Sequence, residues 1–275
     1  MKTKTIALMT CATIVLAGCG GSGGSTTTTT TTSPTYDANF RDGVKTNYSE
    51  LATTKGIESY IGNPDGTISQ VKVRASSDYT TLFVSMDGGE EVEYTGTGGT
   101  TAGSTCITRV WTAANGDKFR IATGTGDTSA YLRFEDNATG LFSRGVGGLE
   151  TAINDLPTNA SYSGFHSAEG AGVTSSGNIA LSVDFANGTL DGSINNANFF
   201  DGSADNTYSA DITGTTNGGR IAATATATGT VTGTLDLAGA AQGPNASELN
   251  GGIAGSLDSG GGAQTLGGYF NLLKQ

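Results

Sequence analysis

The stretch GPNASELNGG, residues 243–252, stands out in a chain that is otherwise rich in glycine and threonine. It contains Pro244, one of only four prolines in 275 residues, and Glu248, which lies in a region with few charges. Proline fixes φ at about −65° and starts turns, and glycine marks places where a strand bends sharply. The stretch therefore predicts a corner between two strands, with Glu248 accepting backbone hydrogen bonds in the turn.

Strand-sized segments with alternating apolar residues lie on both sides of this corner. We count eight of them, at residues 160–168, 178–185, 189–195, 206–214, 220–228, 230–238, 249–257 and 265–272. In NIALSVDF, for example, Ile179, Leu181 and Val183 face one way and the residues between them face the other. Eight antiparallel strands with one apolar face can close into a barrel, which removes exposed edges. The many alanines and glycines at inward positions predict a narrow, packed interior.

These segments resemble the β-barrel domain of transferrin-binding protein B-like surface lipoproteins. The resemblance is carried by VDFANGTLDGSI (183–194), GTVTGTLDLAGAAQGPNASELNGGIAGSL (229–257) and GGYFNLLKQ (267–275). Within the corner motif the matching positions are Gly243, Pro244, Ala246, Glu248, Gly251 and Gly252. The chain departs from the family pattern at Ala241 and Gln242, where the family has an aromatic pair, and at Ile253, which replaces Phe.

The resemblance implies both a fold and a class of function. It implies an all-β chain in which an antiparallel handle sheet, residues 36–157, precedes a closed eight-stranded antiparallel barrel, residues 158–275. The segment around Pro157 marks the boundary, because proline biases the preceding residue towards extended geometry. The resemblance also implies capture of a host protein that carries iron, or of haem, although no single matching residue identifies the ligand.

The first nineteen residues, MKTKTIALMTCATIVLAGC, are typical of a bacterial lipoprotein signal. Two lysines precede an apolar run of about a dozen residues, which is too short to span a bilayer. The run ends in Leu-Ala-Gly-Cys19, which resembles a lipobox; the alternative is a plain secretory signal with a chance cysteine. We predict a signal peptide at residues 1–18, lipidation of Cys19 and a flexible tether at residues 19–35. The expected location is the outer membrane of a Gram-negative bacterium, facing the cell surface, with the lipid as the only membrane contact.

The handle region concentrates the basic residues of the chain. Alternating runs predict strands at residues 68–75, 79–86, 106–113, 117–123, 130–135 and 140–146. Six cations lie on these strands: Lys72, Arg74, Arg109, Lys118, Arg120 and Arg133. If neighbouring strands align, the six share one solvent face and meet an acidic partner; the alternative is an ordinary solvated sheet face. Arginine and aromatic residues are the common anchors of interfaces, and Trp111, Tyr79, Tyr131 and Phe134 lie on or beside the same strands.

The composition argues against several classes of function. The net charge of −11 repels phosphate backbones, so we expect no nucleic-acid partner. The single histidine, His166, is expected on a strand surface and excludes sites that need two histidines. The acidic stretches at residues 87–93 and 201–206 are interpreted as turns rather than Ca²⁺ loops, and residues 96–103 do not fit a phosphate-binding loop. We therefore predict no enzyme activity, cofactor or metal; Cys106, alone in the mature chain, is interpreted as a buried thiol.

Three functions stay open at this point. The first is a lipid-anchored binding protein for an unidentified protein, an iron-bearing ligand or haem. The second is a structural or adhesive surface lipoprotein, and the third is a lipocalin-like barrel for a small ligand. Small inward residues argue against a wide cavity, so we predict a binding protein whose handle carries the partner site.

Overall fold

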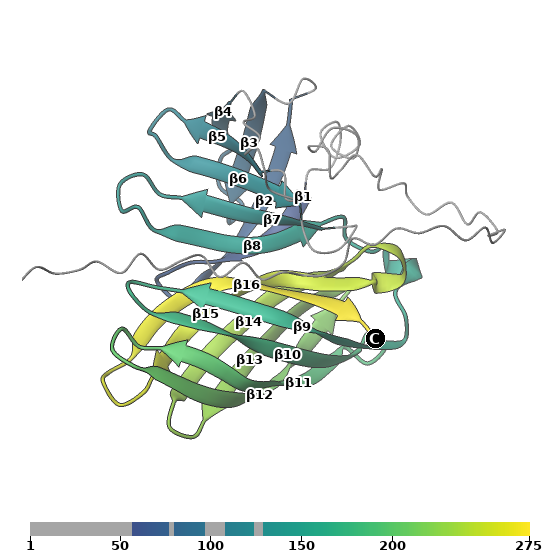
Figure 1. The fold of residues 1–275 in the computed structure, drawn as a ribbon. Coiled ribbons are helices and arrows are strands. Elements are labelled where there is room, and N and C mark those ends of the chain that lie inside the picture. Colours follow the sequence, from purple (N-terminus) through teal and green to yellow (C-terminus); the bar gives the residue numbers. More distant parts are fainter. Residues whose placement is uncertain (1–56, 77–79, 97–107, 124–128) are drawn as a thin grey trace, which may run out of the picture. The chain divides into compact units, whose positions relative to one another are not determined.

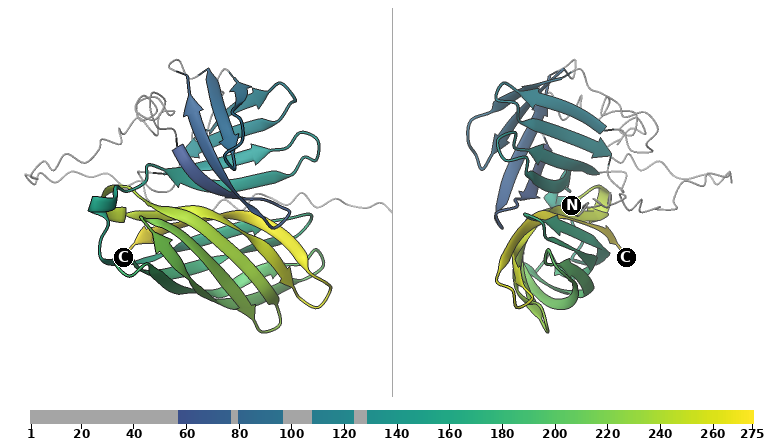
Figure 2. Two further views of the ribbon diagram at one scale, coloured as in Figure 1. Left: turned by 180° about the vertical axis from the view of Figure 1, so that it is seen from behind. Right: turned by 60° about the vertical axis from the view of Figure 1, so that its left-hand side comes forward.

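The computed structural model describes residues 57–76, 80–96, 108–123 and 129–275, which are built almost entirely of antiparallel strands (Figures 1 and 2). The strands form two sheets, and each sheet closes on itself. Two single-turn 3-10 helices, η3 (Ile153–Asp155) and η4 (Pro244–Ala246), interrupt the strands. The predicted all-β fold class is confirmed. The signal peptide, Cys19, the tether and Cys106 lie outside the described residues.

The handle contains the first eight strands. They are β1 (Ile57–Gly62), β2 (Ile68–Ala75), β3 (Thr81–Met86), β4 (Val92–Thr95), β5 (Thr108–Ala113), β6 (Lys118–Thr123), β7 (Ser129–Glu135) and β8 (Phe142–Gly148). Each strand pairs with the next, and β8 returns to pair with β1. The weakest described pairing is β4 with β5, where only Tyr94↔Ala113 and Thr95↔Thr112 are in register. The handle sheet is thus closed as well, rather than a flat sheet.

The second sheet is the predicted eight-stranded barrel. Its strands are β9 (Asn159–Glu169), β10 (Thr174–Asp184), β11 (Thr189–Phe200), β12 (Asp205–Asn217), β13 (Arg220–Thr228), β14 (Thr232–Gln242), β15 (Glu248–Asp258) and β16 (Gln264–Lys274). Each of the eight predicted segments corresponds to one strand. The barrel closes where β16 pairs with β9, from Gly267↔Glu169 to Lys274↔Tyr162, and Figure 2 shows these strands curving round to meet.

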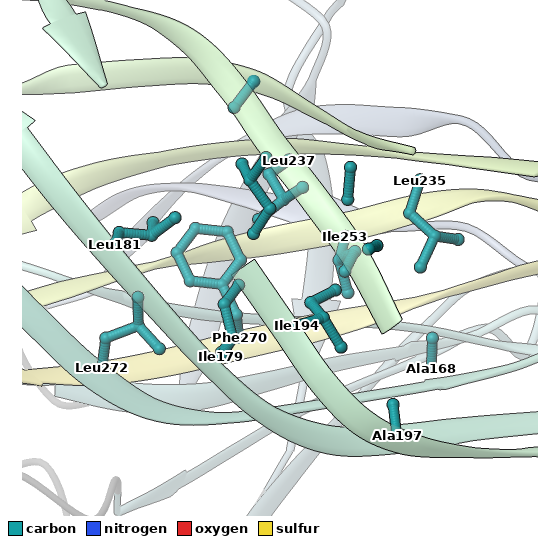
Figure 3. Close-up of a cluster of buried hydrophobic side chains, with 14 of the residues drawn as sticks. Ala168, Ile179, Leu181, Ile194, Ala197, Leu235, Leu237, Ile253, Phe270 and Leu272 are labelled. Atoms are coloured by element: carbon teal, nitrogen blue, oxygen red, sulfur yellow. The ribbon is translucent and has the colours of Figure 1, made fainter. Parts of the chain in front are cut away.

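The barrel interior is filled by side chains that point inward from every strand. In Figure 3, Leu181, Ile194, Leu237 and Phe270 point toward one another from β10, β11, β14 and β16. All four belong to one continuous cluster of buried residues. A buried Leu, Ile or Phe stabilises a fold by roughly 1.5–3 kcal/mol relative to exposure. Gly239 leaves room for Phe270, because an added Cβ at Gly239 would lie 2.6 Å from the end of that ring.

The handle has a separate core of its own. Trp111 and Phe119, which are directly paired across β5 and β6, are completely buried in it. Trp111 is therefore part of the handle core, and the expectation that it helps to form a partner surface is wrong. Phe134 is half-buried and also packs against this core, and Tyr79 lies outside the described residues.

His166 is buried inside the barrel, which corrects the expectation of a surface residue. It alternates with Tyr162 and Ala168 on the inner face of β9, and its exposed fraction is 0%. Its Nε2 lies 3.3 Å from Ser175 Oγ and 3.2 Å from Tyr208 OH, and these two hydroxyls are 2.8 Å apart. Buried polar groups are tolerated when they find hydrogen-bond partners, which explains a histidine at an inward position.

Candidate binding surface and barrel corner

The predicted corner motif folds back over the barrel between β14 and β15. Positive φ angles occur at Gly243 (73°), Asn245 (51°) and Ala246 (54°), and Pro244 begins the short η4 turn between them. Left-handed backbone is unusual at alanine, so surrounding contacts must hold it. The Ala246 side chain lies in the barrel core, and its carbonyl accepts a 2.9 Å hydrogen bond from Tyr162 OH.

The polar residues that follow the corner form a buried network. Glu248 is only 3% exposed and accepts a 2.9 Å hydrogen bond from the Asn250 side-chain amide. The same amide also donates to Gln242 Oε1 at 3.0 Å, and Asn250 Oδ1 accepts from Asn271 Nδ2. Asn250 thus links side chains of β14, β15 and β16, and Glu248 is part of this network. Because a buried carboxylate without partners is costly, this network explains a glutamate in a region with few charges.

Gly252 lies where the first handle strand approaches the barrel. An added Cβ at Gly252 would stand 2.8 Å from the backbone of Ile61 and Gly62. On the neighbouring strand, a Cβ at Gly267 would lie 2.0 Å from the Asn63 carbonyl oxygen. Neither Gly251 nor Gly252 has a positive φ. Gly252 is therefore needed for close backbone approach between β1 and β15, rather than for a bend.

The segment that joins the handle to the barrel is tied to the same corner. Glu150 forms an isolated bridge with Gln242. Thr151 donates from its backbone N–H to the Ala241 carbonyl at 2.9 Å and from Oγ1 to the Gly243 carbonyl at 2.7 Å. The corner motif consequently holds both the barrel end and the connection to the handle, which is an architectural role.

The two cations of the barrel half are engaged within the chain. Arg220 Nη2 lies 2.5 Å from Glu58 and 2.9 Å from Glu150, so it links β13 to the first handle strand and to the connecting segment. Hydrogen bonding to Glu150 and Glu58 raises the pKa of Arg220. Lys274 Nζ donates to the Asn245 carbonyl at 3.0 Å. Both cations therefore have contacts within the chain.

On the handle, Lys72 and Arg74 belong to a first cationic group that is already paired. Arg74 holds Glu91 with two hydrogen bonds, from Nε at 3.0 Å and Nη2 at 2.5 Å, and its guanidinium lies 4.1 Å from the centre of the Phe83 ring. This hydrogen bonding lowers the pKa of Glu91. Lys72 lies 3.5 Å from Glu58. Charge in this group is locally balanced.

A second group lies on β6, β7 and β8. Register places Arg120 opposite Arg133 and Arg133 opposite Arg144, so the three form one row, which we call the arginine row. Lys118 and Arg120 share Glu135, at 2.8 and 3.3 Å, and Arg144 pairs with Glu169 of β9. Arg133 lies over the Phe142 ring, 3.4 Å from its centre. Its pKa is lowered, first by burial and then by the neighbouring charges of Arg144 and Arg120.

Arg109 does not fall into this row. The backbone pairs Arg109 with Ile121, whereas Arg120 is paired with Val110. Partners directly opposite each other in an antiparallel pair share a face, so Arg109 is one residue out of step with Arg120. The six predicted cations thus divide into Lys72 and Arg74 on β2, Lys118, Arg120 and Arg133 on β6 and β7, and Arg109 apart from both.

Sequence reasoning missed Arg144 and the pairing of Arg220. Arg144 alternates with Phe142 in GLFSRGV, the same alternation that marked the other cations, so the signal for it was present. The pairing of Arg220 with residues 162 and 70 positions away has no local signal.

The residues that the structure describes contain neither a cluster of metal ligands nor a helix that could span a membrane. No group of three or more His, Cys, Asp and Glu side chains converges there as metal ligands. Within the same ranges, no helix is both long and apolar enough to cross a bilayer. In the acidic segment at residues 201–206, Asp201 accepts hydrogen bonds from Ser203, Ala204 and Ser259, which is the geometry of a turn.

The chain is similar to solved structures over most of its length and to one protein family over the barrel. Among curated protein sequences, none matches this chain. Transferrin-binding protein B from Haemophilus parasuis Hp5, crystallised as a point mutant, is 17% identical with a TM-score of 0.46, over 80% of this chain and 45% of that chain. The isotype 1 protein from serogroup B Neisseria meningitidis is 14% identical with a TM-score of 0.46, over 80% of this chain and 43% of that chain.

This chain spans less than half the length of either of those proteins. A family model described as the C-lobe and N-lobe beta barrels of Tf-binding protein B matches residues 147–272. That range begins at the end of β8 and takes in nearly all of β9–β16, including the corner motif. Residues 147–272 of this chain are therefore similar to the β-barrels found in the lobes of transferrin-binding protein B.

Proposed function

We propose that this chain is a lipid-anchored binding protein of the Gram-negative outer membrane, and that the outer face of the handle captures its partner. The observation that carries the proposal is the division of charge. Arg220 and Lys274, the cations of the barrel half, are held by groups within the chain. The handle carries a row of three arginines in which Arg133 has no ion pair among the described residues and lies over an aromatic ring; arginine and aromatic side chains are the types that anchor interfaces.

Transferrin is the first partner to test. The matching family and the solved structures are named for transferrin binding, and an iron-carrying host protein is the partner class that this similarity suggests. Haem and other extracellular ligands are the alternatives. A lipocalin-like use of the barrel is disfavoured, because side chains from all eight barrel strands meet in one buried cluster.

The test compares two double variants of the full-length lipoprotein. Arg120→Glu with Arg133→Glu reverses charge on the handle, and Asp191→Lys with Asp211→Lys makes the same number of reversals at exposed positions of the barrel. Capture of iron-loaded transferrin, apo-transferrin and haem is measured by pull-down, after circular dichroism has verified both folds. We expect the handle variant alone to lose capture. Loss in the barrel variant alone would contradict the proposal.

The lipid anchor is tested separately. We expect mass spectrometry of the mature protein to find an acylated N-terminal Cys19, and Cys19→Ala to release the protein from the membrane fraction. Cleavage at another position, or an unmodified Cys19 thiol, would refute the anchor and leave the assignment of the handle surface standing.

A further inference from the structure

The arginine row places three like charges directly side by side on adjacent strands. Arg120, Arg133 and Arg144 occupy opposite positions on β6, β7 and β8. Like charges at directly opposed positions of a sheet destabilise it, and each such contact must be offset by another interaction. A row of three therefore needs either enough carboxylates from the chain or a ligand that supplies them.

The carboxylates of the described chain do not suffice for the row. Glu135 is shared between Lys118 and Arg120, and Glu169 is paired with Arg144. Arg133, in the middle, forms no ion pair within the described residues and contacts the Phe142 ring instead. The Nε atoms of all three arginines are buried without a hydrogen-bond partner there. Unsatisfied buried donors are rare in native proteins and call for an explanation.

We propose that the arginine row binds an acidic segment of a protein partner, with carboxylates set between Arg120 and Arg133 and between Arg133 and Arg144. This inference rests on the proposed function and names the chemistry that the handle recognises. Guanidinium groups match carboxylates in a planar, two-pronged geometry, which makes arginine the usual residue for this task.

The spacing of the row suits an extended acidic segment. Neighbouring strands lie about 4.8 Å apart, so three arginines on three strands span roughly 10 Å. In an extended segment, side chains two residues apart point the same way and stand about 7 Å apart. Two alternating carboxylates, about 7 Å apart, therefore fit within the roughly 10 Å of the row, one towards each end.

Several features favour a protein segment over a polyanion that carries phosphates. The chain has a net charge of −11, which repels extended polyanions and leaves only a local positive patch. The row is bordered by an aromatic ring, because Phe142 lies under Arg133 with the guanidinium 3.4 Å from the ring centre. A protein segment with apolar residues beside its carboxylates matches such a border.

The experiment measures binding of a fluorescent peptide of alternating Glu and Ala to the full-length lipoprotein by anisotropy at low salt. A Gln-Ala peptide is the control for charge. Arg133→Gln removes the central cation, and Arg74→Gln is the matched control, because Arg74 also lies over an aromatic ring but is held by Glu91. Inorganic phosphate and phosphatidylglycerol vesicles are added as competitors to test for phosphate recognition.

We expect the Glu-Ala peptide to bind and Arg133→Gln to weaken it at least about tenfold, with Arg74→Gln unchanged. Arg133→Gln is also expected to leave the melting temperature unchanged or raised, because it relieves repulsion in the row. Any one of four results would overturn the proposal. These are no binding of the Glu-Ala peptide, equal binding of the Gln-Ala peptide, equal loss of binding in Arg74→Gln, or competition by vesicles but not by acidic peptide. If partner capture depends on the handle while the acidic peptide fails to bind, the proposed function stands and this inference falls.

Discussion

At the scale of single residues, the buried histidine is the clearest case of a group whose environment sets its chemistry. Burial lowers the pKa of His166 from 6.5 to about 4. At neutral pH the imidazole is therefore uncharged, and it shares hydrogen bonds with Ser175 and Tyr208. An uncharged imidazole is compatible with this buried position, whereas protonation in the folded state would place a positive charge in the barrel core.

This environment predicts acid sensitivity that depends on His166. Its pKa is lower in the folded than in the unfolded state, so between pH 6.5 and 4 the unfolded chain binds more protons, and stability falls as pH falls. The loss from this residue is about 2 kcal/mol between pH 8 and pH 5. In His166→Gln that part of the loss should vanish. Urea unfolding of both proteins at the two pH values measures it, and identical pH dependence would refute the prediction.

At the scale of elements, the local sequence pattern predicted the barrel strands better than the handle strands. Alternation located all eight strands of the barrel, but it placed the start of β10 (Thr174–Asp184) at residue 178, four residues too late. That strand begins with Thr-Ser-Ser-Gly, residues typical of turns, and only pairing with β9 and β11 keeps them extended. In the handle, the sequence pattern missed β1 (Ile57–Gly62) and β4 (Val92–Thr95). The strand β4 has only four residues and follows an acidic turn, so it shows little alternation.

The positions of strands do not fix their register, which limited the prediction of the binding surface. Lys118, Arg120 and Arg133 were correctly placed on strands, but the row depends on Arg120 lying opposite Arg133. A shift of one residue would turn a side chain to the other face, and the backbone pairs Arg109 with Ile121 rather than with Arg120. Register comes from turn lengths and pairing with distant strands, which no single segment encodes.

The contact between β1 and β15 predicts different outcomes for two glycines. In Gly252→Ala the new Cβ would lie 2.8 Å from the backbone of Ile61 and Gly62, so one of the strands must shift. We expect a loss of about 1–3 kcal/mol of unfolding free energy, with increased hydrogen exchange in β1. Gly261→Ala is the control, since its Cβ meets no heavy atom within 4 Å. Equal effects of the two substitutions on stability would contradict this account of Gly252.

At the scale of the whole molecule, the two closed sheets are connected by groups that come from distant parts of the sequence. The segment at Glu150 and Thr151 forms hydrogen bonds with the corner motif. Gly252 on β15 and Gly267 on β16 have no side chain, which allows the backbone of residues 61–63 to approach these strands closely. Arg220 adds an electrostatic link, because its two carboxylates come from β1 and from the connecting segment. A barrel arginine thus joins the two sheets. In the arginine row, by contrast, the paired carboxylates are fewer than the cations.

The link through Arg220 predicts an energetic coupling between the two sheets. The Arg220 side chain is 40% exposed, so solvent screens the pair and we expect Arg220→Gln to cost only about 1 kcal/mol. In a double-mutant cycle, Arg220→Gln and Glu58→Gln should be coupled by roughly 0.5–1 kcal/mol in urea unfolding, because each removes the same contact.

Arg220→Gln should also increase hydrogen exchange in β1, where Glu58 lies. Arg74→Gln is the control, because its partner Glu91 belongs to the same sheet and its loss should leave exchange at β13 unaltered. Additive effects of the Arg220 and Glu58 substitutions would show that the ion pair does not couple the handle to the barrel.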